Sequence, residues 1–457
     1  MSTTDRGHAR GWRLHFGLLW AGGALSSLGY IALGLAFPLL ALHQTASPVV
    51  AGCIAATGMV PRTLLHIPIG LLVDRRDPRT VMIVSQAVRV VCVLGLVGPV
   101  LLLDAPVALL GAAAAVHGVC ATCHSTAATT AVPYLIPREE LTGAAAKNEA
   151  RSHAAQLTGR PLGGGLYGLA HGLPAVCDAV VSAVSLILAL RLPRIRPDRP
   201  APGETHLLRD LVQGFTQLRR DRFLLLTAVA GTVTNALFQM IWLVILMLAT
   251  QEGLSTLLLG VVLAASGAGG LLGSLIAPYT VSRRSPVTMV TLCLWGWAAV
   301  TLLLALTDHD NVARLLVVLP LTWSGVGFVG AHINVTVLTY HSKNVPTEVL
   351  GRVTSTLRFF TGAALPVGVV AGGFLLDALG VRGTTLAVTG VIAVLAVVFT
   401  AITPPLPSLL RRLARRPCPR ARPAPGTASP RSGAAARPAR AVPEPPPPRD
   451  LSPSGRE

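Results

Sequence analysis

Ionisable residues recur at helical spacing inside long apolar stretches of this chain. Arg62 and His66 are four residues apart, and His117 and His124 are seven apart, so each pair shares one face of a helix. Arg89 lies alone in a neighbouring apolar stretch. Histidine titrates near neutral pH and can carry a proton, and an ionisable residue at membrane depth is a functional candidate because burying it is expensive.

Two further ionisable residues, Arg160 and Asp178, lie on consecutive apolar stretches and are expected to pair in the outer half of the membrane. Such a pair would keep the carboxylate charged at neutral pH, which makes it a poor proton carrier. The histidines are therefore the favoured carriers. The complete set of coupling candidates is Arg62, His66, His117, His124, Arg160 and Asp178.

Cys120, Cys123 and His124 spell C-x-x-C-H, the pattern of covalent haem attachment. Attachment requires an exposed segment, whereas this motif lies well inside an apolar stretch. A metal site that uses His117, Cys120 and His124 is geometrically possible on one helical face, but no Cys/His cluster elsewhere completes it. We therefore expect neither a cofactor nor a metal, and keep a membrane redox or haem protein as the alternative from another class.

The composition predicts an all-α integral membrane protein. Of its 457 residues, 52% are hydrophobic and 13% are charged, and apolar runs of roughly 20 residues are long enough to cross a bilayer as helices. Twelve spans are predicted, at about residues 16–42, 50–73, 80–103, 106–128, 146–170, 174–192, 223–249, 255–281, 287–306, 312–340, 353–376 and 383–403.

The net charge of +18 could suggest nucleic-acid binding, but its distribution argues against that function. Residues 404–457 hold eleven arginines and three acidic residues. Most other basic residues flank one side of the predicted spans, which places both termini in the cytoplasm by the positive-inside rule. We expect a monomeric multi-pass protein of the cell membrane whose macromolecular surroundings are the lipid bilayer and not a nucleic acid.

The predicted spans divide into two halves of six. Residues 1–192 form the first six-helix bundle and residues 223–403 the second. The linker, residues 193–222, is proline-rich at its start and ends in a predicted cytoplasmic amphipathic helix. The tail, residues 404–457, is rich in proline and arginine and is expected to be disordered and cytoplasmic.

The two halves carry a faint internal repeat. The pattern Pro137-x-Glu139-x-Leu141 recurs in the second half as Pro346-x-Glu348-x-Leu350. The glycines at 159 and 163–165 have counterparts at 368 and 372–373, at the same distance along the chain from each pattern. Parallel repeats in a membrane chain are typical of transporters that rock around a site between their halves.

The turn after the second predicted span resembles a signature of the major facilitator superfamily. Residues 70–79 read GLLVDRRDPR, which is similar to that family's G-x-L-x-D-R-x-x-x-R loop. Physically, an acid here can meet a helix N-terminus of the other half and hold the cytoplasmic side shut. The residues to which the resemblance assigns gating are Gly70, Asp74, Arg75, Arg79 and Arg352.

Other segments resemble the branch of macrolide-efflux proteins and enterobactin-type exporters, including the opening Leu19-Trp20-Ala21-Gly22-Gly23 and Gly351-Arg352-Val353. The resemblance covers roughly residues 14–403. It departs where Tyr30 follows Gly29 in place of an acid. The resemblance implies that spans one, four, seven and ten line a central cavity, which makes the substrate-facing candidates Tyr30, His117, His124, Asn235, Gln239, Trp242 and His332.

Together these features predict a secondary active exporter and not an enzyme. The cargo is expected to be a small amphipathic molecule such as an antibiotic, a drug or a siderophore-like product, so that export could confer antibiotic resistance. No G-x-x-x-x-G-K-[ST] loop is present in the sequence, which favours proton-driven antiport. An importer of the same fold is the main alternative.

The gating loop yields a testable prediction. Asp74→Asn should impair transport while membrane insertion stays normal, because the neutral amide loses its attraction to the facing helix N-terminus. Transport rate and membrane-fraction abundance are compared with those of the wild type. Transport at the wild-type rate would contradict a latch role for Asp74.

Overall fold

The computed structural model describes residues 3–97, 106–137, 140–195, 215–216, 219, 221–307, 311–345 and 347–402. The described helices belong to one compact unit within residues 1–403. The tail and most of the predicted amphipathic helix of the linker lie outside the described residues. The compact unit is helical throughout its described membrane-spanning parts, which confirms the predicted all-α membrane fold.

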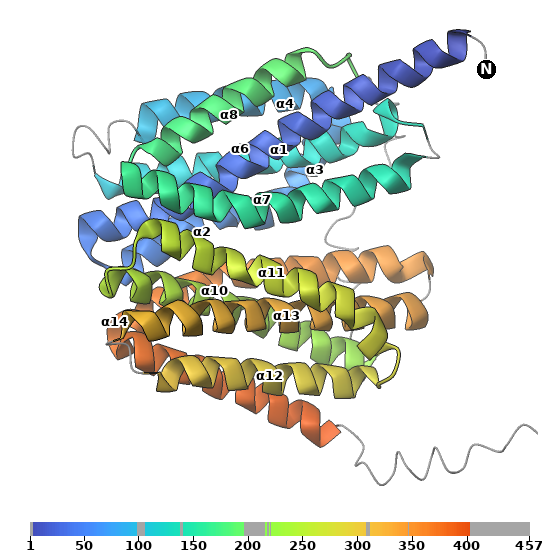
Figure 1. Ribbon diagram of the computed structural model, residues 1–457. Helices are drawn as coiled ribbons and strands as arrows, with labels where there is room; N and C mark the ends of the chain where they lie inside the picture. The colour runs from blue at the N-terminus through green and yellow to red at the C-terminus, as the bar shows by residue number, and fades with distance from the viewer. Residues whose placement is uncertain are drawn as a thin grey trace, which may run out of the picture. The chain divides into compact units, whose positions relative to one another are not determined.

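Two groups of helices make up this unit, and Figure 1 draws the first in blue to green and the second in yellow-green to red. The first group contains α1 (Thr3–Thr45), α2 (Pro48–Leu64), α3 (His66–Arg75), α4 (Pro78–Cys92), the π-helical turn η1 (Val93–Val97), α6 (Val107–Leu135), α7 (Leu141–Leu169) and α8 (Leu173–Leu190). The second contains α10 (Arg222–Gln251), α11 (Thr256–Val281), α12 (Pro286–Leu306), α13 (Val312–Asn344) and α14 (Thr347–Ile402).

Nine helices within the described residues are long and apolar enough to cross a membrane, and α2 is a shorter apolar helix. The second predicted span corresponds to α2 with α3, and the third to α4 with η1. The last two spans are both contained in α14. The fifth predicted span corresponds to α7, which is not among these nine apolar helices. With α7 included, the described helices account for the twelve predicted spans as two six-helix bundles.

Two predicted spans have backbone features that hydropathy does not reveal. The second is interrupted at Leu65, between α2 and α3. Pro68 has no N–H to donate to the carbonyl of Leu64, so the helical hydrogen-bond ladder cannot run through this point. In α14 the two spans meet at Gly380, whose φ of 66° lies in the left-handed region that glycine adopts without strain.

Within each bundle, neighbouring helices pack along their lengths. In the first, α1 packs against α7 and α8, and α6 packs against α2 and α4. In the second, α11 packs against α13, and α10 and α12 pack against α14. Between the bundles, α7 lies against α11 and α2 lies against α14.

The glycines of the sequence repeat make equivalent contacts in the two bundles. A side chain added at Gly159 would meet Ile31 of α1, and one added at Gly368 would meet the backbone of Ala236 of α10. Each set also contains a position that faces a backbone carbonyl of the other bundle. Added side chains at Gly164 and Gly373 would meet the backbone carbonyls of Thr256 in α11 and Pro48 in α2, respectively.

The contacts of Gly164 and Gly373 with the other bundle lie at the end of the unit where α1 ends and α2 begins, and where α10 ends and α11 begins. At the same end, Gly52 of α2 faces the carbonyl of Val369, and Gly260 of α11 faces that of Arg160. Small residues let helix backbones approach this closely in a membrane. The two bundles are therefore held together at this end by backbone-to-backbone packing.

This packing predicts a position-specific effect of one added methyl group. Gly164→Ala should destabilise the protein by about 1–3 kcal/mol, because the methyl group overlaps the Thr256 carbonyl. Gly390→Ala is the matched control, since Gly390 is also helical and has no neighbour within 4 Å of the added atom. Thermal unfolding of the detergent-solubilised protein measures both. Equal melting temperatures for the two variants would contradict the close contact.

Candidate substrate cavity and buried ionic cluster

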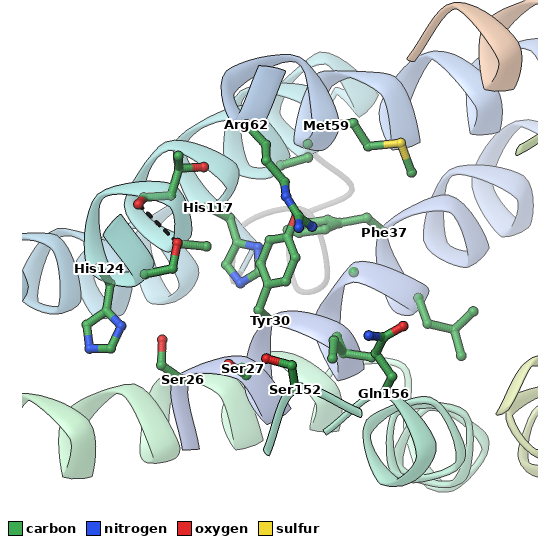
Figure 2. Close-up of a pocket in the computed structure, with 18 of the residues that line it drawn as sticks. Ser26, Ser27, Tyr30, Phe37, Met59, Arg62, His117, His124, Ser152 and Gln156 are labelled. Atoms are coloured by element: carbon green, nitrogen blue, oxygen red, sulfur yellow. Dashed lines mark hydrogen bonds between the residues drawn. The ribbon is translucent and has the colours of Figure 1, made fainter. Parts of the chain in front are cut away.

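A cavity of about 620 Å³ lies inside the unit, between the two bundles. Its lining comes mainly from α1, α2, α6 and α7, with Gln239 and Trp242 of α10 and Leu365 of α14 completing it. Figure 2 shows the labelled lining residues of the first bundle gathered around one space. The cavity is the size of a pocket for a small molecule.

An aromatic group forms part of the cavity wall. The rings of Tyr30 and His117 stack with their centroids 5.2 Å apart and an interplanar angle of 15°. Phe37 meets His117 edge-on, at 5.5 Å between centroids. Across the cavity, Gln239 Nε2 lies 3.2 Å from the sulfur of Met59, which joins α10 to α2. This wall offers flat apolar surfaces beside polar ring atoms.

Three arginines also line the cavity. Arg62 lies in the last turn of α2, is exposed, and extends toward Tyr30 in Figure 2. Arg151 of α7 lies against Gly23, and its buried Nε has no hydrogen-bond partner in the described part of the chain. Arg160 of α7 donates hydrogen bonds to the Leu263 carbonyl and to Ser266 Oγ of α11.

Behind the aromatic wall lies a buried ionic cluster. Arg89 of α4 and Asp178 of α8 are both 0% exposed and form a bidentate ion pair, with Arg89 Nε 3.1 Å from Asp178 Oδ2 and a second contact through Arg89 Nη2. Arg89 Nη1 also donates to Ser26 Oγ at 3.0 Å. His117 Nε2 lies 3.3 Å from Asp178 Oδ2. His117 therefore touches both the cavity and the buried carboxylate.

A second polar chain crosses the same bundle. Gln86 Nε2 donates to Ser185 Oγ at 2.8 Å, and Ser185 Oγ donates to the carbonyl of Gly22 at 3.0 Å. His124 Nε2 lies 3.4 Å from the same hydroxyl and lines the cavity. Four helices of the first bundle are thus joined by buried polar contacts, each of which gains strength from the low dielectric around it.

The structure brings most of the predicted site residues together. The residues that line the cavity are Tyr30, Arg62, His117, His124, Arg160, Gln239 and Trp242. Asn235 and His332 are not among its described lining residues. Asn235 donates to the Gly231 carbonyl of its own helix, and buried His332 packs its ring on Phe328.

The expected ion pair between Arg160 and Asp178 is wrong. Asp178 pairs with Arg89 and contacts His117, because α8 packs against α4 and α1. Arg160 faces α11 in the other bundle and bonds there to backbone and hydroxyl oxygens. The sequence singles out Arg89 as a charge in an apolar stretch but gives it no partner. Arg151 is likewise a charge within a predicted span, residues 146–170, whereas Ser26 carries no comparable sequence signal.

The gating candidates are described only in part. The side chains of His66, Asp74 and Arg352 lie outside the described residues. Gly70 and Arg75 are in α3, and Arg75 is exposed. Arg79 donates to the carbonyls of Ala189 and Leu190, so it caps the C-terminal end of α8 within its own bundle.

The haem-like motif lies within α6, where Cys120 and His124 are buried and Cys123 is half-buried. Among the residues that the structure describes, no group of three or more His, Cys, Asp or Glu side chains is placed to hold a metal ion. The alternative of a haem protein therefore gains no support from the geometry of this segment.

Two six-helix bundles around a central polar cavity are the architecture of a multi-pass membrane transporter. The family model of the Major Facilitator Superfamily matches residues 19–365. The chain belongs to the Major Facilitator Superfamily.

Comparisons with known proteins agree with this architecture. Macrolide efflux protein A of Streptococcus pyogenes is 21% identical over 382 residues, which cover 81% of this chain and 91% of the relative. Among solved structures, the nucleoside transporter NupG aligns with a TM-score of 0.65 at 14% identity, over 84% of this chain and 98% of that chain. A bacterial homologue of the iron transporter ferroportin, in an inward-facing state, aligns with a TM-score of 0.62 at 16% identity, over 85% of this chain and 98% of the other. At these identities the structural matches establish the fold alone.

The ionic cluster predicts strong coupling between its two charges. Asp178→Asn should destabilise the protein by about 3–5 kcal/mol, because it leaves the buried Arg89 charge without its counter-ion. The double variant Arg89→Gln/Asp178→Asn should lose less than the sum of the two single variants. A double-mutant cycle on thermal or denaturant unfolding measures this coupling. Additive losses would contradict a cooperative ion pair.

Proposed function

We propose that this protein is a secondary active exporter of a small amphipathic molecule and that it works by alternating access. The cavity between the bundles is the observation that carries the proposal, because it combines aromatic surfaces with polar side chains in a volume suited to one small molecule. The macrolide efflux relative supports export over import and an antibiotic-like or other amphipathic cargo.

The packing between the bundles supports a rocking mechanism. Close backbone approaches at Gly52, Gly164 and Gly373 hold the bundles together at the end where α1 finishes. With both termini in the cytoplasm of a cell-membrane protein, as the charge distribution predicts, this end faces outward. Transport would then require these contacts to part while the opposite end closes, with Asp74 and the neighbouring arginines of the gating loop on the cytoplasmic side.

Protons are the proposed driving ion, and His117 is the proposed carrier. His117 lies in the cavity wall and 3.3 Å from Asp178, so a change in its charge would be felt both by a bound cargo and by the buried ion pair. The titratable or charged groups near it on packed helices are Tyr30 of α1, Arg62 of α2, Arg89 and Cys92 of α4, and Asp178 of α8. Cys120 and His124 lie on its own helix, α6. The tight Arg89–Asp178 pair leaves Asp178 less suited to exchange protons than the histidine.

Export is tested in everted membrane vesicles that are acidified inside. Vesicles with the wild-type chain are challenged with a macrolide, a catecholate siderophore and an anionic dye, and dissipation of the pH gradient is followed with a pH-sensitive fluorophore. Proton-coupled export predicts dissipation by at least one cargo, and that this cargo accumulates inside the vesicles. Cargo movement in the opposite direction along the proton gradient would support an importer instead.

The proposed carrier gives a pH-dependent prediction. His117→Gln should flatten the dependence of export on pH between about 5.5 and 8.5, because glutamine keeps polarity but cannot take up a proton. His43→Gln is the matched control, since His43 is exposed at the end of α1 and outside the cavity lining. A wild-type pH profile for His117→Gln would remove His117 as the coupling site. His124→Gln, measured in the same assay, tests the second cavity histidine.

A further inference from the structure

The charged side chains in the described cavity lining are all positive. Arg62, Arg151 and Arg160 line it, and none of the described lining residues is an aspartate or a glutamate. None of the three arginines forms an ion pair with a carboxylate within the described residues. Arginine stays protonated in proteins, so these three groups give the cavity a positive potential at any physiological pH.

The one buried acid near the cavity does not offset this charge. Asp178 is 0% exposed and is already matched by Arg89, so the pair is neutral and lies behind the wall. The second bundle adds only Gln239, Trp242 and Leu365 to the described lining, and none of these side chains carries a charge. The positive field therefore comes from the first bundle and acts on whatever occupies the cavity.

Arginines without counter-charges at membrane depth are costly unless they face a wet cavity or gain an anionic partner. Arg62 is exposed, and Arg151 keeps a buried Nε without a hydrogen-bond partner in the described part of the chain. A guanidinium binds carboxylate or phosphate oxygens through two parallel hydrogen bonds, which gives both affinity and orientation. Aromatic surfaces at Tyr30 and Phe37 lie in the same cavity and can cover an apolar body.

We infer that the cargo of this transporter is an anionic amphipathic molecule, in which an apolar or aromatic body carries a carboxylate or phosphate group that binds Arg62 and is attracted by the positive charge of Arg151 and Arg160 in the same lining. The inference rests on the proposed function, because it names the chemical class of the exported molecule. It also separates that class from cationic amphipathic compounds, whose positive charge would be repelled by the same lining.

The test uses two dyes with the same three-ring xanthene skeleton and opposite charge, carboxyfluorescein (anionic) and rhodamine 123 (cationic). Binding to the full-length protein in nanodiscs of zwitterionic lipid is measured by fluorescence anisotropy at several salt concentrations. We expect carboxyfluorescein to bind more tightly than rhodamine 123. Arg62→Gln should weaken carboxyfluorescein binding about tenfold, whereas Arg62→Lys should retain most of it because the charge remains.

Arg382→Gln is the matched control, since Arg382 is an exposed arginine of α14 outside the cavity lining, and it should bind both dyes as the wild type does. The basic tail is present in every variant, so any binding to it is common to all measurements. Rhodamine 123 binding as tightly as carboxyfluorescein, binding of neither dye, or unchanged carboxyfluorescein binding in Arg62→Gln would each overturn the inference. Export is measured separately, by dye flux in vesicles. Selective binding without flux would contradict the proposed export and leave the charge preference standing.

Discussion

The architecture depends on how closely helix backbones can approach where a bilayer supplies no hydrophobic force between them. Such association relies on packing, and packing needs small residues at the contact. The repeated glycines meet this requirement in both bundles, with Gly163 against α1 and Gly372 against α10 inside their own bundles. Gly164 and Gly373 then bring each bundle against the start of a helix in the other. The cavity exists because these contacts fix the separation of the bundles at one end.

Within the packed helices, several buried polar groups are placed where they have partners, because burying a polar group without one is costly. The Arg89–Asp178 pair is neutral and fully buried, and hydrogen bonds and close polar contacts link Gln86, Ser185 and His124 with the carbonyl of Gly22 across four helices. These contacts fix the rotation of α4, α6 and α8 about their axes. His117 stacks on Tyr30 and lies 3.3 Å from Asp178, so the buried cluster directly contacts the aromatic wall of the cavity.

The sequence predicts those features that depend on residues close together in the chain, and it fails for features that depend on contacts between distant helices. Hydropathy locates most of the spans because the length of an apolar helix is a local property, although α7 is not among the helices apolar enough to be recognised in this way. The repeat locates several of the glycines that make the contacts between bundles. The rotation of a helix about its own axis is not a local property, because it depends on the helices that pack against it. The partner of Asp178 depends on which helices flank α8 and how they are rotated, so the expected pair with Arg160 was wrong and Arg89 had no assigned partner. The interruption at Leu65 reflects the proline three residues later, which a hydropathy average does not register.

The unequal contribution of the two bundles to the cavity lining has a consequence for how such a protein could change over generations. Every charged or titratable side chain in the described lining comes from the first bundle, while the second supplies an amide, an indole and an aliphatic group. The close backbone contacts are made by glycines of both bundles, whereas the charged and titratable lining groups belong to the first. Substitutions of those lining side chains, such as Arg62, can therefore alter which molecules are accepted without adding an atom at the glycine contacts. The set of accepted molecules can in this way diversify from one descendant to the next while the glycine contacts between the bundles stay the same.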